Sequence, residues 1–341
     1  MIKGASNTGL LKIKYTRPRL NKHLVPRPDL DDRLDDSLNH KVTLITAPAG
    51  YGKTTAVLKW LETLTLPSAW LSLDAEDNEA IVFWRYFCAA LDNIFSNISK
   101  DAGYVFTSQE LLKAKVHLSI LIDKLTNISS DFLLILDDFH FINNQVVLDD
   151  LSYFITYLPA NLHLILISRT APQLKLAKLG LKENLLRIRT KDLRFSSEEI
   201  YQYYQARGYP LPKEEIQKIE GYTEGWAAAL VAVTLSFKDE NYEHRVISIL
   251  KNSHLHIETY LAEDVFHIWT REQQDFMVKT SVVDRLCGPL CEAITDYDGS
   301  RLLKELYDEN SFLVALDDDG TWFRYHHLFY GFSTEKTRKN E

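Results

Sequence analysis

The chain has 341 residues, 45% of them hydrophobic, and its 39 Lys and Arg against 47 Asp and Glu give a formal net charge of −8. This length predicts roughly two to three domains with apolar cores, and the acidic balance disfavours a chain that grips nucleic acid or an anionic membrane. Three cysteines are too few for a disulfide framework, and we find neither an apolar run of membrane-spanning length nor a secretory signal, so we expect a cytoplasmic protein.

Strand and helix patterns alternate over the first half of the chain. Residues 24–28 read Leu-Val-Pro-Arg-Pro and lead into an acidic, helix-like stretch at 29–38. Beyond them, strands are expected at 42–47, 69–73, 131–137, 162–168 and 185–189, and helices at 111–125 and 146–158. Most of the strand runs are apolar throughout, which predicts a parallel sheet covered on both faces. The result is a three-layer α/β domain that ends near residue 190.

The first strand runs into a small-residue loop. Residues 44–54 read Leu-Ile-Thr-Ala-Pro-Ala-Gly-Tyr-Gly-Lys-Thr, and a helix is expected to begin at Lys53. The N–H groups of such a loop can turn inward on a phosphate, and the helix dipole adds to them. Lys53 supplies a charge for the β- and γ-phosphates, and the Thr54 hydroxyl is placed to ligate Mg²⁺. Ala47 replaces the first Gly of the usual pattern, which requires ordinary backbone angles there.

A second apolar run ends in two carboxylates. Residues 132–138 read Phe-Leu-Leu-Ile-Leu-Asp-Asp, which is typical of a buried strand whose carboxyl end lies at a ligand crevice. Asp137 would hold Mg²⁺ through water, and Asp138 would orient or deprotonate an attacking water. Alone, the same pattern fits a strand followed by an acidic turn about equally well. Together with the upstream loop, it favours a P-loop site for a nucleoside triphosphate.

Beyond residue 191 the strand signal stops. Capping boxes at Ser196/Glu199 and Thr270/Gln273 each predict the start of a helix. Helices are expected after Ser196 and at 213–220, 224–237, 243–251, 256–267, 271–280, 288–295 and 299–309, and a hairpin at 312–316 and 321–325. Three helices and a hairpin describe a winged helix, so we expect a helical domain followed by a winged-helix domain. A polar tail closes the sequence.

Nine segments give the chain a family resemblance. They are Leu24-Val-Pro-Arg-Pro, Thr46-Ala-Pro-Ala-Gly-Tyr-Gly-Lys-Thr-Thr, Trp70-Leu-Ser-Leu-Asp-Ala-Glu-Asp-Asn, Leu136-Asp-Asp-Phe-His, Ser168-Arg, Asp192-Leu-Arg-Phe, Thr223-Glu-Gly-Trp, Leu286-Cys-Gly-Pro-Leu-Cys and Trp322-Phe-Arg-Tyr-His-His-Leu-Phe. The sequence resembles the signal-transduction ATPases with numerous domains (STAND), specifically the amino-terminal half of large LuxR-type transcription activators similar to the maltose regulator. In that family Ala heads the phosphate loop, as it does here.

The resemblance implies a domain plan and a nucleotide site. The plan is a lead with an adenine-contact segment (1–40), a P-loop domain (41–191), a helical domain (192–268), a winged helix (269–333) and the tail (334–341). The nucleotide-binding residues would be Val25, Arg27, Pro48, Ala49, Gly50, Tyr51, Gly52, Lys53, Thr54, Thr55, Arg169 and His326, with Asp137 and Asp138 catalytic and Thr54 and Asp137 holding Mg²⁺. Arg169 would sense the γ-phosphate, since a guanidinium there feels whether that group is present.

Two positions depart from the family or stay open. Members usually have Gly-Gly-Trp-Pro where this chain has Glu224, Gly, Trp and Ala227, which puts a base contact at residue 227 in doubt. His326 or His327 would hold the β-phosphate of ADP, and we prefer His326. An ordinary core or surface histidine is about as probable for either one.

The family's function is a switch. The three domains would close around ADP at rest, and ATP plus an inducer would open them for self-association, with slow ATP hydrolysis restoring the closed form. Sensor repeats and a DNA-reading helix-turn-helix do not appear before Glu341, so the inducer would bind through a missing C-terminal region and this fragment should not bind DNA directly. The alternatives are a P-loop kinase, an AAA-like motor ATPase and, disfavoured by net charge, a DNA-binding winged helix.

Overall fold

The computed structural model describes residues 9–20, 24–95, 98, 114–237, 257, 260, 269–308, 313–317, 319–326 and 328. The chain divides into two compact units. The first unit comprises residues 1–21, 28–46 and 53–189, and the second comprises 22–27, 47–52 and 190–341. Within the described residues, no helix combines the length and apolarity needed to cross a bilayer.

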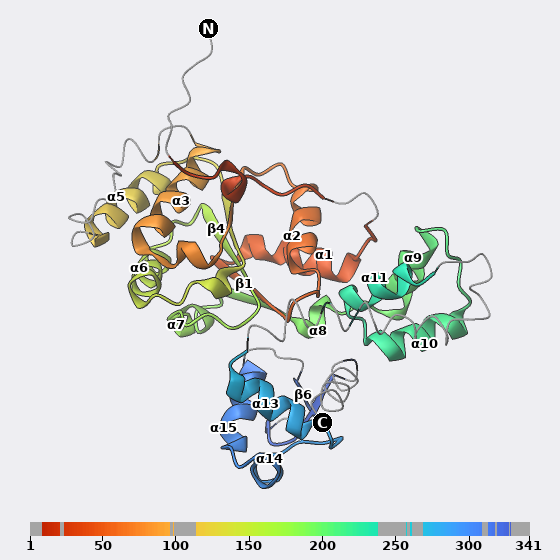
Figure 1. Cartoon of the computed structure of the whole chain (residues 1–341). Coiled ribbons are helices and arrows are strands. Elements are labelled where there is room, and N and C mark those ends of the chain that lie inside the picture. Colours follow the sequence, from red (N-terminus) through yellow and green to blue (C-terminus); the bar gives the residue numbers. More distant parts are fainter. Residues whose placement is uncertain are drawn as a thin grey trace. The chain divides into compact units, whose positions relative to one another are not determined.

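The first unit is built on a five-stranded parallel sheet (Figure 1). Its strands are β1 (Val42–Thr46), β2 (Ser68–Ser72), β3 (Phe132–Asp137), β4 (Leu162–Ser168) and β5 (Leu185–Arg189), in the order β2-β3-β4-β1-β5. Each lies within one residue of the range expected from its apolar run. The order places the carboxyl ends of β1, β3 and β4 next to one another at one edge of the sheet.

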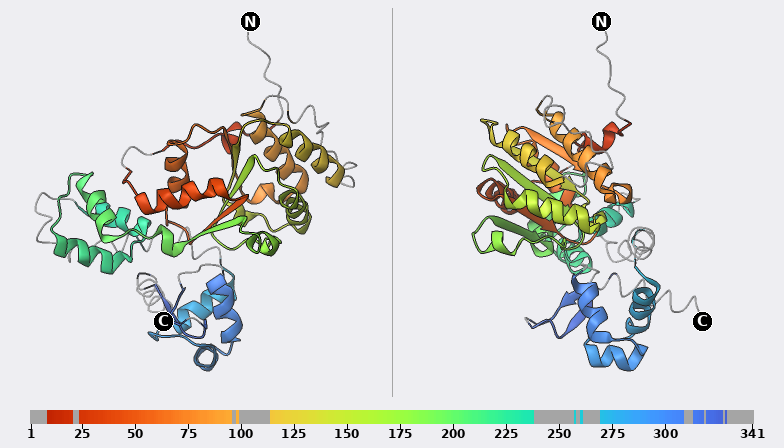
Figure 2. Two further views of the ribbon diagram at one scale, coloured as in Figure 1. Left: turned by 180° about the vertical axis from the view of Figure 1, so that it is seen from behind. Right: turned by 90° about the vertical axis from the view of Figure 1, so that its left-hand side faces the viewer.

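Helices cover both faces of this sheet (Figure 2), which confirms the predicted three-layer α/β class. The helices of the first unit are α1 (Pro28–Asp35), α2 (Lys53–Leu61), α3 (Ala80–Asp92), α5 (Ala114–Thr126), α6 (Gln145–Thr156) and α7 (Ala177–Gly180), with short 3₁₀ turns η1 (Lys12–Tyr15), η2 (Asp36–Asn39), η3 (Ala75–Asn78) and η5 (Phe139–Phe141). On one face, alternate residues of β1 to β4 pack with α3, α5 and α6. Most of the intervening strand residues are buried as well, as a sheet covered on both sides requires.

Helix α3 has no counterpart among the expected elements. It buries Phe83, Trp84 and Phe87, whose rings contact one another and Phe154 of α6, with Phe87 and Phe154 5.3 Å apart edge to face. Edge-to-face aromatic pairs of this kind add about 0.5–1.5 kcal/mol beyond the burial of their area. This cluster fixes α3 and α6 against β3 and the loops that follow β2 and β3.

The second unit begins with a small helical core. Its helices are α8 (Thr190–Leu193), α9 (Ser197–Gln205), α10 (Lys213–Thr223) and α11 (Ala227–Leu235). The Ser196/Glu199 capping box is formed as predicted, and Val25 from the lead segment is part of the same core. The expected helix at 224–237 begins three residues later, because Glu224 and Gly225 adopt left-handed backbone angles that end α10. The helix expected at 243–251 lies outside the described residues, as does all of 256–267 except 257 and 260.

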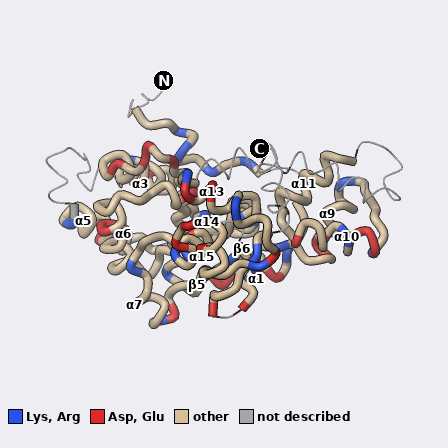
Figure 3. The backbone as a smooth tube through the Cα atoms, turned by 60° about the horizontal axis from the view of Figure 1, so that its bottom comes forward, with Lys and Arg blue, Asp and Glu red and all other residues tan. Residues whose placement is uncertain are grey.

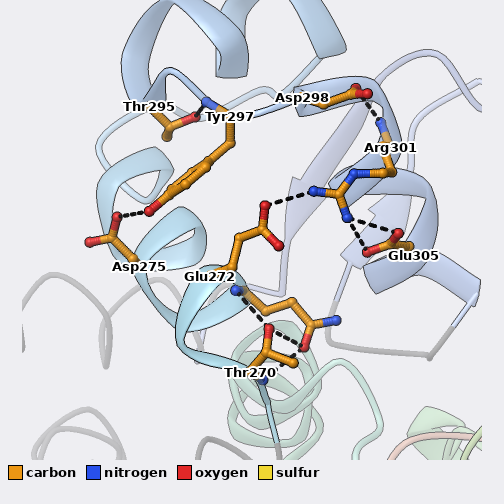
Figure 4. Close-up of polar contacts among 9 residues, drawn as sticks. Thr270, Glu272, Asp275, Thr295, Tyr297, Asp298, Arg301 and Glu305 are labelled. Carbon is orange, nitrogen blue, oxygen red and sulfur yellow. Dashed lines mark hydrogen bonds and ion pairs between the residues drawn. The ribbon is translucent and has the colours of Figure 1, made fainter.

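The winged-helix elements follow in the predicted order. They are α13 (Arg271–Thr280), α14 (Gly288–Thr295), α15 (Gly299–Asp308) and an antiparallel pair, β6 (Leu313–Ala315) with β7 (Phe323–Tyr325). Polar contacts tie α13 to the segments that follow α14: Tyr297 donates to Asp275, and Arg301 of α15 donates to Glu272 (Figure 4). Arg301 also donates to Glu305 within α15. Acidic and basic positions are mixed on α13 to α15 (Figure 3).

Candidate functional site

The loop after β1 has the backbone that its sequence predicts. Gly50 and Gly52 adopt positive φ angles of 76° and 75°, which favour glycine, and α2 begins at Lys53. Ala47 is fully buried and is not among the residues with positive φ, so ordinary backbone angles suffice there, as predicted. The loop therefore combines two left-handed glycines with a helix start, the arrangement that turns N–H groups toward an anion.

Within the second unit, the loop is held by the start of α11. The Trp226 indole Nε1 donates to the Ala49 carbonyl at 3.1 Å, and the Ala228 N–H donates to the Gly50 carbonyl at 3.0 Å. A Cβ atom on Gly50 would come within 2.6 Å of the Ala228 Cβ and 2.8 Å of Trp226 Nε1. Gly50 is thus required both for its backbone angle and for this close approach.

The remaining loop positions differ in exposure. Tyr51 is buried, and burial raises its pKa to about 12; its ring lies 6.4 Å from the Trp226 ring. Pro48 is buried too, whereas Thr55 is exposed on α2. The nucleotide contacts predicted for Pro48, Tyr51 and Thr55 remain predictions.

In the first unit, the first turn of α2 contacts the last residue of β3. The Thr54 hydroxyl donates to the two Asp137 carboxylate oxygens, each at 3.1 Å. The next residue, Asp138, has left-handed backbone angles (φ 55°), and its N–H donates to the Asp137 carboxylate at 3.0 Å. This turn fixes Asp137 over α2 and leaves the Asp138 side chain 43% exposed.

Two basic side chains, those of Lys53 and Arg169, lie close to these carboxyl groups. Lys53 is 7% exposed, and burial together with the charge of Arg169 lowers its pKa to about 8, although Asp138 and Asp137 oppose the shift. Arg169 directly follows β4. A buried ammonium whose pKa is depressed beside a guanidinium is stabilised by any added anion. The structure therefore brings Lys53, Thr54, Asp137, Asp138 and Arg169 together, as the sequence predicts.

The pKa values of Asp137 and Asp138 are shifted upward, opposite to that of Lys53. Burial and the neighbouring charge of Asp138 raise the pKa of Asp137 to about 7, and burial raises the pKa of Asp138. A divalent cation would reverse these shifts by favouring the carboxylate forms.

These residues fit Mg²⁺. The described residues contain no cluster of three or more His, Cys, Asp and Glu that could cage a metal ion. P-loop proteins hold Mg²⁺ differently, with one hydroxyl and one carboxylate plus phosphate oxygens and water. The Thr54 hydroxyl and the Asp137 carboxylate, already 3.1 Å apart, are such a pair.

His140 belongs to this site, although it was not among the predicted site residues. Its side chain is 10% exposed, neither ring nitrogen makes a hydrogen bond, and Nδ1 lies 3.7 Å from an Asp138 oxygen. Burial and the charges of Arg169 and Lys53 lower its pKa to about 3, so the imidazole is neutral. The signal was present in the sequence, since His140 ends the Leu-Asp-Asp-Phe-His segment. Only the left-handed turn at Asp138 shows that it folds back toward the carboxylate.

Val25 and Arg27 lie in the second unit. Val25 is buried in the helical core. The Arg27 guanidinium donates to the Glu199 carboxylate and to the carbonyls of Leu193 and Arg194, and it lies 4.2 Å from the centre of the Phe195 ring. These contacts hold the lead segment on α8 and α9. The adenine and ribose contacts predicted for both residues remain predictions.

His326 is also in the second unit and is 1% exposed. Its Nε2 lies 3.8 Å from a Glu224 oxygen, and its ring lies 6.0 Å from that of Trp226. Arg324 pairs with both Glu224 oxygens, at 3.0 and 3.1 Å. Glu224, at a position where the family usually has Gly, therefore pairs with Arg324 of strand β7. His327 lies outside the described residues.

Comparison with known proteins shows what this chain is similar to. Residues 262–341 match the family model of the MalT winged helix domain. The chain is 30% identical over 331 residues to the HTH-type transcriptional regulator MalT of Klebsiella pneumoniae, and 31% identical over 339 residues to that of Serratia proteamaculans. This chain is MalT-like over nearly its whole length. The alignments cover 96% of this chain but only 37% and 36% of the two relatives, so the MalT-like chain spans little more than a third of their length.

A solved structure supports the fold. The Walker-type ATPase of Pyrococcus abyssi superimposes with a TM-score of 0.58 at 15% identity, covering 93% of this chain and 98% of that one. At this identity the likeness concerns the fold alone. It agrees with the parallel sheet of the MalT-like chain.

Proposed function

We propose that this chain is the ATP- and ADP-dependent switch of a MalT-type transcription regulator, with slow ATPase activity. In the ADP form it is closed, and ATP together with an inducer opens it for self-association. The observation that carries the proposal is the convergence of Lys53, Arg169 and the Thr54–Asp137 pair at the ends of adjacent strands. Two cations beside a hydroxyl–carboxylate pair match a nucleotide polyphosphate with its Mg²⁺.

Each residue then has a role in binding. The N–H groups of residues 50–53 and the Lys53 ammonium hold the phosphates, and Thr54 with Asp137 would hold Mg²⁺. When bound, Mg²⁺ neutralises charge on the phosphate oxygens. Arg169 distinguishes ATP from ADP because its guanidinium pairs with the terminal phosphate only when that phosphate is present. In the second unit, Val25, Arg27 and His326 are the proposed contacts to the base, ribose and β-phosphate.

Hydrolysis would use the turn after β3. Asp138 orients the attacking water or accepts its proton. Neutral His140, 3.7 Å from Asp138 and without a hydrogen bond of its own, can accept a hydrogen bond from that water or donate one to the terminal phosphate. A slow rate suits a switch, because the lifetime of the ATP form sets the duration of the signal.

Two further assignments rest on the relatives. The two MalT relatives are HTH-type transcriptional regulators, and this chain corresponds to little more than a third of each. We assign inducer binding and DNA reading to regions outside the matched segment. The winged helix is a poor DNA reader, since Arg301 of α15 is already paired with Glu272 and Glu305.

A P-loop kinase or an AAA-like motor ATPase is the alternative. A kinase transfers the phosphoryl group to an acceptor other than water, whereas the switch releases inorganic phosphate slowly and retains ADP. Phosphate release measured with and without candidate acceptors separates the kinase from the switch.

The decisive experiment is to denature the purified protein and identify the released small molecule by mass spectrometry. We expect ADP from the native chain and none from Lys53→Ala. Calorimetry with ADP and ATP on nucleotide-free protein completes the test. Absence of bound nucleotide together with absence of binding to either one would refute the proposal.

A further inference from the structure

The 3₁₀ turn η3, which follows β2, contacts the site without belonging to it. η3 is the end of the Trp-Leu-Ser-Leu-Asp-Ala-Glu-Asp-Asn segment, to which the proposed function assigns no role. Its last residue, Asn78, makes three hydrogen bonds to the loop that follows η5. Asn78 Oδ1 accepts from the N–H of Asn143 at 2.9 Å and of Asn144 at 2.8 Å, and Asn78 Nδ2 donates to Asn143 Oδ1 at 2.6 Å.

The turn that carries Asn78 is itself held firmly. A capping box joins Asp74 and Asp77, with the Asp74 N–H donating to Asp77 at 2.8 Å. Lys14 of η1, 8% exposed, pairs with Asp74 at 2.9 Å and Asp77 at 2.5 Å. The Lys14 ammonium also lies 4.7 Å from the centre of the Tyr86 ring. Asn78 therefore projects from a fixed support.

The segment that receives these bonds is short and carries the site. It runs from Asp138 through η5, with His140 in the middle, to Asn144, which caps α6 by accepting from the Val146 N–H at 2.9 Å. Within it, Phe141 N–H donates to the Asp138 carbonyl at 3.2 Å. One end follows directly on β3, and the other is the pair of N–H groups held by Asn78. The positions of Asp138 and His140 therefore depend on both ends.

We propose that Asn78 is a positioning residue for ATP hydrolysis, which sets Asp138 and His140 by clamping the far end of their turn. The inference rests on the proposed ATPase function of the same site. Small displacements of catalytic groups are costly, and about 1 Å can reduce a rate by about a hundredfold. Asn78 contacts the loop rather than the site residues, so its loss should slow hydrolysis and leave nucleotide affinity unchanged.

The test uses three variants of the chain. Asn78→Ala removes all three hydrogen bonds. Asn78→Asp retains an oxygen that accepts from both N–H groups, and the Asn143 amide can turn to donate to it. Asn144→Ala removes the cap of α6 but keeps its own N–H bonded to Asn78, so it is a control that lowers stability without opening the clamp.

The first measurement is the rate of single-turnover hydrolysis of Mg·ATP, together with the dissociation constant for ATP. The second is amide hydrogen exchange at residues 143 and 144 without nucleotide. We expect Asn78→Ala to hydrolyse about tenfold to a hundredfold more slowly at unchanged affinity, and to lose exchange protection at both amides. Asn78→Asp should restore most of the rate and the protection. Asn144→Ala should keep a rate close to that of the native chain.

Several results would overturn the proposal. Protection at residues 143 and 144 that survives in Asn78→Ala would show that Asn78 is no clamp, and this readout needs no activity. A native rate in Asn78→Ala, an Asn78→Asp variant as slow as Asn78→Ala, or equal slowing in Asn144→Ala would show that the role is merely structural. If the native chain neither binds nor hydrolyses ATP, the proposed function fails, whereas the exchange data still decide whether the clamp exists.

Discussion

Replacing Gly50 by Ala should damage the phosphate loop more than replacing Gly52. Both glycines have the same left-handed backbone, with φ of 76° and 75°, so both substitutions carry a conformational cost of about 1–2 kcal/mol. They differ in their surroundings. A Cβ on Gly50 would meet the Ala228 Cβ at 2.6 Å, whereas a Cβ on Gly52 finds its nearest atom, the Ala227 Cβ, at 3.9 Å. Forcing a methyl group into a packed site costs about 1–3 kcal/mol more. We therefore expect about 2–5 kcal/mol for Gly50→Ala and about 1–2 kcal/mol for Gly52→Ala.

The comparison is made on nucleotide-free protein by thermal and urea unfolding, followed by calorimetric titration with ADP. If the loop moves to relieve the clash, ADP affinity should fall by roughly tenfold for each 1.4 kcal/mol transferred to the bound state. A compensating change is available: Ala228→Gly removes the closest atom and should recover part of the loss in the Gly50→Ala background. Equal destabilisation by the two alanines, or no recovery in the double variant, would refute the packing of the loop against α11.

Four other outcomes follow from the proposed site. Asp138→Ala should bind ATP but suppress its turnover; unchanged phosphate release would assign the catalytic carboxylate elsewhere. Arg169→Ala should reduce discrimination between ATP and ADP, and an unaltered ratio of the two dissociation constants would remove Arg169 from the sensor role. Burial and the charge of Arg169 lower the pKa of Lys53 to about 8. Because the phosphates bind the ammonium form, ADP affinity should fall above pH 8, by up to tenfold per unit, and binding there should take up protons; an affinity independent of pH between 7 and 9.5 would contradict this. His140→Ala should slow single-turnover hydrolysis without a rise in the dissociation constant for ATP, and a native rate would exclude His140 from the reaction.

Much of the first unit could be predicted because its signals are local. Strands buried on both faces are apolar throughout, and the expected ranges for β1 to β5 agree with the structure to within one residue. Lys53 with Thr54, and the two acids at the end of β3, are likewise recognised from their order along the chain. Because parallel strands end at the same edge of a sheet, these residues had to converge.

Other features depend on tertiary contacts that no local pattern reveals. Helix α3 reads Ala-Ile-Val-Phe-Trp-Arg-Tyr-Phe-Cys-Ala-Ala-Leu-Asp, and so many aromatic and β-branched residues obscure a helical stripe. The position of His140 depends on the left-handed backbone angles of Asp138, and these angles cannot be predicted from the sequence. The pairs Arg27–Glu199, Arg324–Glu224 and Asn78–Asn143 join residues 65 to 172 positions apart along the chain, beyond the reach of periodicity or spacing.

Because the peptide bond is planar, the carbonyl contacts of Ala49 and Gly50 also orient the N–H groups of the residues that follow. A trans peptide directs its N–H away from its C=O. With the two carbonyls turned to Trp226 and the Ala228 N–H, the amide hydrogens of Gly50 and Tyr51 must face the opposite side. One short stretch of α11 thereby aims two donors at once. If that stretch rotated, both donors would turn away together. On the proposed function, anion binding and the position of α11 against the loop are therefore one coupled equilibrium, and a ligand that stabilises one stabilises the other.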